Sequence, residues 1–254
     1  LGGSVSALRA TDLPYPSSFT TAFSQSQKLV LPNDPAEIST PAAETYISQR
    51  SQLPAGSTLQ SLLGNPDYTA VQGLLEGLGL PRDLLQPYRP WFAHQILAQK
   101  LLERDGFETS RAVDTYLLGL AKTLFKPRGF LDTYQQAVEA SASVPDGAWV
   151  DLIRDRGEGV PLESVNDRVG FTSAQIVARW RNGDAAGLGS IMDQLAVRHP
   201  KVYASLVSQP LDRWIPALES QLQSGQTAFA VLRVGHLVGR SGLLRRLQER
   251  GYLV

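Results

Sequence analysis

The chain has 254 residues, and its 24 Lys and Arg balance its 24 Asp and Glu, so the formal net charge at pH 7 is zero. The zero net charge favours neither nucleic acid nor anionic lipid as a partner, and no apolar run is long enough to span a membrane. The absence of cysteine excludes disulfides, thiolate metal ligands and cysteine nucleophiles. The length suits a single domain over residues 1–254.

Four short stretches are predicted to be β-strands, and they are spread along the whole chain. The first is the end of a strand within residues 1–8, and the next two lie at 28–31 and 127–132. The fourth, 227–234, is an almost unbroken apolar run typical of a central strand that is covered on both faces. Strands separated by long helical segments predict a small, mostly parallel sheet.

Helical patterns fill the two regions between the second, third and fourth strands. They cover 55–125 and 134–222, apart from a Gly- and Pro-containing stretch at 156–166 that is typical of a loop. The predicted fold is therefore α/β and helix-rich, with many helices surrounding the central sheet. We expect the two helical regions to form a cap or lobe over one end of the sheet.

The last stretch of the chain places a histidine where α/β proteins commonly carry chemistry. His236 follows the fourth strand and lies between Gly235 and Gly239, and a leucine-rich helix follows. In open α/β sheets, ligands and catalytic groups gather just beyond the carboxyl ends of the strands. Residues 252–254 are predicted to form a short final strand. The favoured interpretation of His236 is nevertheless a structural histidine that is hydrogen-bonded to backbone at a strand end, and the alternative is a residue that lines a ligand pocket.

The ending resembles that of the TraB/PrgY/GumN family, which closes with a strand, a Gly-x-x-His-Leu motif, a leucine-rich helix and a Gly-Tyr pair. The matching residues are His-Leu-Val-Gly at 236–239, Gly-Leu-Leu at 242–244 and Arg-Gly-Tyr at 250–252. Trp180 with Gly183 and Asp184 is similar to the family's Trp-x-x-Gly-Asp, and the resemblance covers nearly the whole chain. It implies the fold of the TIKI-type, ChaN and erythromycin-esterase-like group, and in TIKI-type relatives a metal-dependent hydrolase.

Several positions depart from the polar site that the resemblance implies. The first Gly-x-x-His motif keeps Gly3 but has Ser6 in place of histidine, and Pro32 stands where the family has an acidic residue. Pro210 falls on the family's arginine, and Arg233 replaces the glycine before His236. One imidazole with a serine and no aligned carboxylate is a poor donor set for an ion. We therefore expect no metal and no other cofactor.

The leading hypothesis is a non-catalytic, degenerate-site member of the family, a pseudoenzyme. It would bind a peptide, a protein partner or a small acidic ligand through His236, Arg233, Ser6 and Gly3. The fixed positive charge of Arg233 would oppose a cation and favour a carboxylate.

Two alternatives stay open at this stage. The first is a metal-dependent, metalloprotease-like hydrolase that uses His236 with Asp34, Asp132 or Ser6. Asp114 and Asp132 would also suit acid–base roles, although capping or salt bridging is the favoured explanation for them. The second is a structural partner in envelope polysaccharide export, as the GumN-type relatives suggest. The resemblance further favours an exported, periplasmic or lipoprotein-like location, although the sequence starts at Leu1 without a leader.

Overall fold

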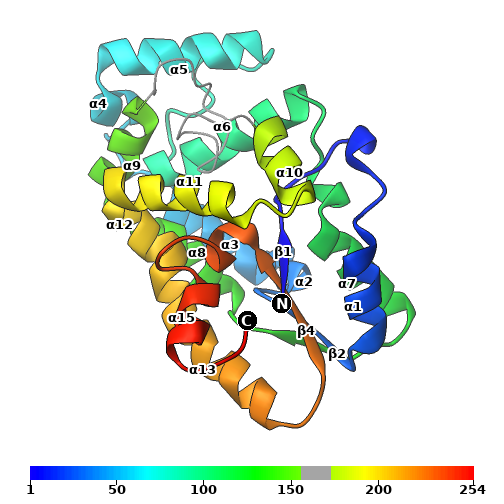
Figure 1. Cartoon of the computed structure of the whole chain (residues 1–254). Coiled ribbons are helices and arrows are strands. Elements are labelled where there is room, and N and C mark those ends of the chain that lie inside the picture. The colour runs from blue at the N-terminus through cyan, green and yellow to red at the C-terminus, as the bar shows by residue number, and fades with distance from the viewer. Residues whose placement is uncertain (156–172) are drawn as a thin grey trace.

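The sheet is small, parallel and enclosed by helices in the computed structural model, which describes residues 1–155 and 173–254 (Figure 1). Its strands are β1 (Gly2–Ser4), β2 (Lys28–Leu31), β3 (Arg128–Phe130) and β4 (Ala228–Arg233), in the order β1-β4-β2-β3. Each described pair is parallel. The predicted helix-rich α/β fold, with its four strand positions, is confirmed.

The strand β4 occupies the centre because its residues are apolar on both sides of the pleat. Phe229, Ala230, Val231 and Leu232 are all buried. Its register pairs Lys28 with Ala228 on one side and Ser4 with Arg233 on the other. Since every pairing is parallel, the four strands end at the same edge of the sheet.

Helices make up most of the described chain, and several begin with a side-chain cap, such as Thr40, Thr58 and Thr133. The α-helices are α1 (Ser17–Gln25), α2 (Pro35–Ile38), α3 (Pro41–Ser51), α4 (Leu59–Leu63), α5 (Asn65–Gly77), α6 (Pro90–Arg104), α7 (Val113–Thr123), α8 (Tyr134–Ala142), α9 (Asp146–Arg154), α10 (Ser173–Arg181), α11 (Ala185–Arg198), α12 (Pro200–Tyr203), α13 (Gln209–Gln223), α14 (Val234–Leu237) and α15 (Leu243–Glu249). A π-helical segment, Ala204–Ser208, joins α12 to α13.

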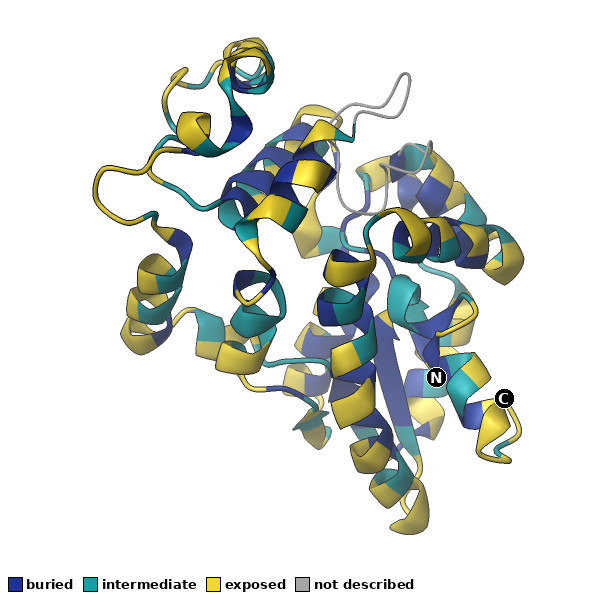
Figure 2. Cartoon of the chain, turned by 90° about the vertical axis from the view of Figure 1, so that its left-hand side faces the viewer, coloured by how far each residue is buried: buried dark blue, intermediate teal, exposed yellow. Residues whose placement is uncertain are grey.

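Two apolar clusters are present among the described residues. The main one includes the buried residues of β2 and β4 and the helix faces turned toward them, which are dark blue in Figure 2. The second lies among α4, α5, α6 and α9, and Leu63, Tyr68, Leu75 and Leu97 are buried in it. It lies within the region expected to form a cap. That the two helical regions act together as one cap stays a prediction.

The predicted final strand at 252–254 is wrong. Gly251 has a φ of +88°, and the Tyr252 N–H donates to the Leu247 carbonyl at 3.1 Å, so the chain folds back onto α15 instead of extending along the sheet. The predicted loop at 156–166 lies outside the described residues. Among the described helices, none has the length and apolar character needed to cross a membrane.

Candidate functional site

The candidate residues follow the ends of all four strands. Ser6 lies two residues after β1, Pro32 directly after β2, Asp132 two residues after β3, and His236 three residues after β4. Parallel strands bring these positions to one edge of the sheet, which we call the carboxyl edge. The topology therefore gathers residues from distant parts of the sequence into one region.

Arg233 and Ser6 are in direct contact at the carboxyl edge. Pairing of Ser4 with Arg233 places the end of β4 beside the end of β1. From there the Arg233 guanidinium donates through Nη1 to the Ser6 hydroxyl oxygen. Arg233 is exposed, and no carboxylate of the described residues forms an ion pair with it. The result is a cation and a hydroxyl side by side at the surface.

Asp132 is buried and already neutralised. The Pro32 carbonyl accepts the Asp132 N–H at 2.7 Å, which fixes the backbone just beyond β3. Both carboxylate oxygens of Asp132 then accept from Arg213, with Nε and Nη2 each at 3.0 Å. A bidentate pair of this kind uses the acceptor sites that would otherwise face a metal or a substrate.

His236 lies in α14, the single helical turn that follows β4, and its ring lies 4.7 Å from that of Trp214, centroid to centroid. Its Nε2 lies 2.9 Å from the Leu206 carbonyl oxygen. That oxygen can only accept, so the bond assigns the proton to Nε2. Nδ1 is buried, and no described residue reaches it with acceptable hydrogen-bond geometry.

Burial lowers the pKa of His236 to about 4. The positive charge of Arg233 acts in the same direction, whereas the backbone contacts with Leu206 and Arg233 and the charge of Asp132 partly oppose it. The imidazole is therefore neutral at pH 7. A group with so low a pKa is a weak general base.

The Leu206 carbonyl is available because of Pro210. In a regular α-helix the N–H of residue 210 would donate to this carbonyl, but proline has no N–H and its ring clashes with the carbonyl four residues before it. The chain responds with the π-helical segment, within which Leu206 lies. The proline that falls on the family's arginine thus helps to create the acceptor that holds His236.

Arg213 is the residue that the sequence analysis missed. The resemblance places the family's arginine at Pro210 and therefore gives no reason to assign a function to Arg213. It lies three residues further along α13, almost one helical turn, and directly before Trp214. That spacing was the available signal, since residues three apart share a helix face.

The other candidates have local structural contacts. The Gly3 carbonyl accepts from Trp180 Nε1 at 2.6 Å, and a Cβ at Gly3 would lie 3.3 Å from the side chains of Val234 and Leu237. Asp34 caps α2 by accepting from the Ala36 N–H at 3.0 Å. Asp114 lies in the first turn of α7 and accepts from its neighbour Thr115. No described hydrogen bond links these residues to His236.

The whole chain matches the sequence pattern of one known family. The sequence pattern of the TraB/PrgY/gumN family matches residues 1–254. The chain belongs to the TraB/PrgY/gumN family. No curated protein and no solved structure is found that matches it.

The metal implied by TIKI-type members of the TraB/PrgY/gumN family does not fit the donors present here. The Asp132 oxygens are bound by Arg213, Ser6 is bound by Arg233, and Pro32 offers no side-chain ligand. Within residues 1–155 and 173–254, no three His, Cys, Asp or Glu side chains are grouped so as to hold an ion.

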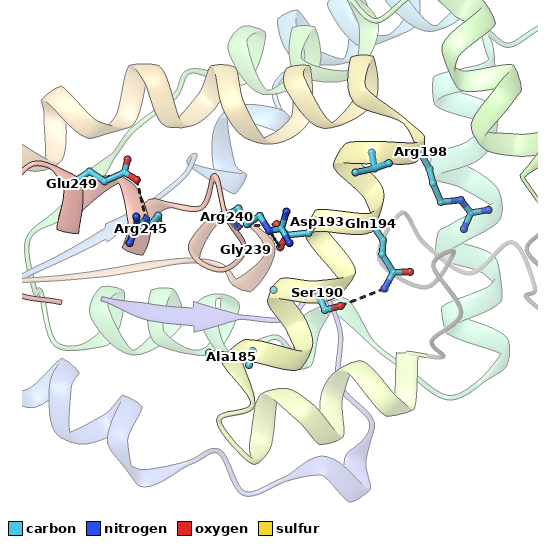
Figure 3. A pocket seen from close by; sticks show the side chains of 12 residues that line it. Ala185, Ser190, Asp193, Gln194, Arg198, Gly239, Arg240, Arg245 and Glu249 are labelled. Carbon is cyan, nitrogen blue, oxygen red and sulfur yellow. Dashed lines mark hydrogen bonds and ion pairs between the residues drawn. The ribbon is translucent and has the colours of Figure 1, made fainter.

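A groove of about 990 Å³ lies away from the carboxyl-edge residues, between α11 and the segment 239–249 (Figure 3). Asp193 accepts the Arg240 N–H there at 2.8 Å, and Arg245 pairs with Glu249 at 2.9 Å. None of Ser6, Asp132, Arg233 and His236 lines it. The groove is therefore distinct from the site where other family members are expected to hold their ion.

Proposed function

We propose that this chain is a non-catalytic TraB/PrgY/gumN family member that binds a carboxylate at the carboxyl edge, either a peptide C-terminus or a small acidic ligand. The supporting observation is the exposed Arg233 guanidinium beside the Ser6 hydroxyl, with no carboxylate partner among the described residues. The nearby Asp132 does not compete for Arg233, because Arg213 already neutralises it.

The chemistry of this pair suits an anion. A guanidinium has five N–H donors, and only one nitrogen is engaged with Ser6, so further donors remain for a bidentate carboxylate contact. The Ser6 hydroxyl accepts from Arg233 and keeps its own proton to donate to a ligand oxygen. The same fixed charge would repel a divalent cation.

His236 has a supporting role in this proposal. Its Nε2–H holds α14 against the π-helical segment, and its neutral ring packs on Trp214. Arg233 starts α14 as its N-terminal cap residue, so the bond formed by His236 helps to fix the position of Arg233. His236 therefore acts through Arg233 and does not itself contact the ligand.

Calorimetric binding of trialanine, compared with its C-terminal amide, tests the proposal. Arg233→Gln is expected to weaken binding of the free carboxylate about tenfold, because a charge-assisted hydrogen bond is lost. Ser6→Ala is expected to weaken it by a smaller factor. Arg240→Gln is a matched control, since Arg240 is also an exposed arginine but lies in the groove of Figure 3.

Equal affinity for the amide, or an unchanged affinity in Arg233→Gln, would contradict carboxylate binding. Peptide cleavage that requires an added divalent metal and disappears in His236→Ala would instead support the metal-dependent hydrolase. The two results are distinguishable, because binding is measured without metal and cleavage with it.

The proposal also includes the location of the protein in the cell. The family resemblance favours export to the periplasm or a lipoprotein-like attachment. Fractionation of cells that produce the full-length natural protein would place it in the periplasmic or membrane fraction. Recovery in the cytosolic fraction alone would contradict the proposed location.

A further inference from the structure

The helix α7 ends at a phenylalanine in a conformation that favours glycine. The Lys126 N–H donates to the Ala121 carbonyl at 2.9 Å, and the Phe125 N–H to the Lys122 carbonyl at 3.3 Å, which together form a Schellman motif. Phe125 occupies its left-handed position with a φ of +54°. It is the one non-glycine residue with positive φ in the described ranges, 1–155 and 173–254.

The Phe125 side chain makes too little packing contact to offset the energetic cost of this backbone conformation. Phe125 is 92% exposed and the preceding Leu124 is 59% exposed. A bulky residue with positive φ is unfavourable for the backbone, and an exposed aromatic ring contributes little to a core. When a residue has an unfavourable backbone conformation and its side chain is not packed in the fold, a contact with another molecule is a reasonable explanation.

The stretches of sequence that lead into β2, β3 and β4 carry no acidic residue. Each of α1, α7 and α13 leads through a short loop into the start of a strand, so three loops meet at the edge where β2, β3 and β4 begin (Figure 1). The segments 17–31, 115–131 and 220–233 comprise α1, the later part of α7, the end of α13 and the loops and strands that follow them. They have no Asp or Glu, although the chain has 24 acidic residues, and the acidic residues of α7 and α13 lie earlier in those helices, at Asp114, Asp212 and Glu219. The zero net charge of the chain hides this local imbalance.

Two cations beside Phe125 have no described partner of opposite charge. Lys122 and Arg128 are exposed, and neither forms an ion pair with a described residue. Lys126 differs, because its ammonium group is held by the carbonyls of Phe23 and Ser26 at the end of α1. Leu124 and Phe125 are exposed and lie between these two cations in the sequence, and we call these four residues the basic tip.

We propose that the basic tip binds the surface of a bilayer that contains anionic lipid. Phe125 and Leu124 would enter the boundary between headgroups and acyl chains, and Lys122 and Arg128 would contact lipid phosphates. A projecting aromatic side chain next to cations suits a soft interface, which needs no complementary pocket. This docking would direct the carboxyl edge, with Arg233, away from the membrane.

Flotation of the full chain with vesicles tests this inference. The protein is expected to float with equimolar phosphatidylcholine and phosphatidylglycerol vesicles at low salt and to remain behind with phosphatidylcholine alone. Phe125→Gly should lower the partition coefficient about tenfold, as expected for loss of a partly buried aromatic side chain. Lys122→Gln and Arg128→Gln should each lower it about fivefold, and added salt should weaken binding.

Matched controls come from α11 and α15. Val197→Ser removes an apolar side chain that is 82% exposed, and Arg245→Gln removes an exposed cation, and both should leave flotation unchanged. Because glycine relieves the strained backbone, Phe125→Gly should fold at least as well as the natural chain, which thermal unfolding verifies. A loss of binding in this variant therefore cannot be ascribed to misfolding.

Three outcomes would overturn the inference. The first is failure to float with the phosphatidylglycerol vesicles, and the second is equal flotation of Phe125→Gly. The third is Phe125-dependent retention on immobilised polyglutamate without vesicle binding, which would assign the basic tip to an acidic protein instead.

Discussion

The neutral state of His236 is a property of its surroundings and links the stability of the fold to pH. Its folded pKa of about 4 lies below the ordinary value of 6.5, so the unfolded chain takes up the proton first as the pH falls. The stability that neutral His236 contributes is therefore complete above about pH 6.5 and is lost progressively between about pH 6.5 and pH 4.

We expect His236→Gln to reduce this pH dependence. Glutamine can still donate to the Leu206 carbonyl but does not titrate, so the stability difference between the natural chain and the variant should shrink by up to about 3 kcal/mol from pH 7 to pH 4. Urea unfolding at both pH values measures it. If the stability difference between the natural chain and the variant were the same at pH 7 and pH 4, the pKa of His236 would be the same in the folded and the unfolded chain.

Phe125→Gly tests the backbone strain independently of any membrane. Glycine adopts positive φ without a Cβ clash, so the variant should be more stable than the natural chain by about 1 kcal/mol in urea unfolding. Phe125→Ala keeps a Cβ and is the matched control, since it should give little or no gain. If the alanine variant were as stable as the glycine variant, exposure of the ring and not strain would explain the effect.

Between elements, the Asp132–Arg213 pair connects the end of β3 to α13. The carboxylate side chain is 5% exposed and the arginine side chain is 36% exposed, so the two members differ in their access to water. Removing Arg213 leaves a buried charge without compensation, whereas removing Asp132 leaves a cation that water can still reach.

Arg213→Ala should therefore destabilise the fold more than Asp132→Ala, by about 3 kcal/mol against about 1 kcal/mol in urea unfolding. The double variant should be less destabilised than the sum of the two, because the uncompensated carboxylate is gone. Arg245→Ala, which breaks the exposed pair with Glu249, should change stability by less than about 0.5 kcal/mol. Equal and additive effects at 132 and 213 would contradict a coupled buried pair.

At the scale of the whole molecule, two apolar clusters imply regions of different stability. The second cluster packs α4 and α5 against α6 and α9, and it contains no residue of the sheet. Regions that bury less apolar surface open at lower free energy than the central core. The segment 59–77 is therefore expected to open without unfolding of the sheet.

Native-state hydrogen exchange should detect this opening. Amides of α5 should exchange at a lower free energy than those of β2 and β4, and Leu75→Ala should lower the value for α5 more than for β4. Leu75 is fully buried in the second cluster and so provides a local perturbation. The same exchange free energy in α5 and β4, in the natural chain and in the variant, would indicate a single cooperative unit.

The sequence by itself determined the four strands, the helical regions and the family, because apolar runs and spaced motifs are local signals. It also placed His236 beyond the end of a buried strand. Only the tertiary structure decided what these residues contact. Arg213 meets Asp132 from 81 residues away, and His236 meets Leu206 from 30 residues away. Such contacts depend on how α13 packs against the sheet and on the backbone change at Pro210, and sequence spacing encodes neither.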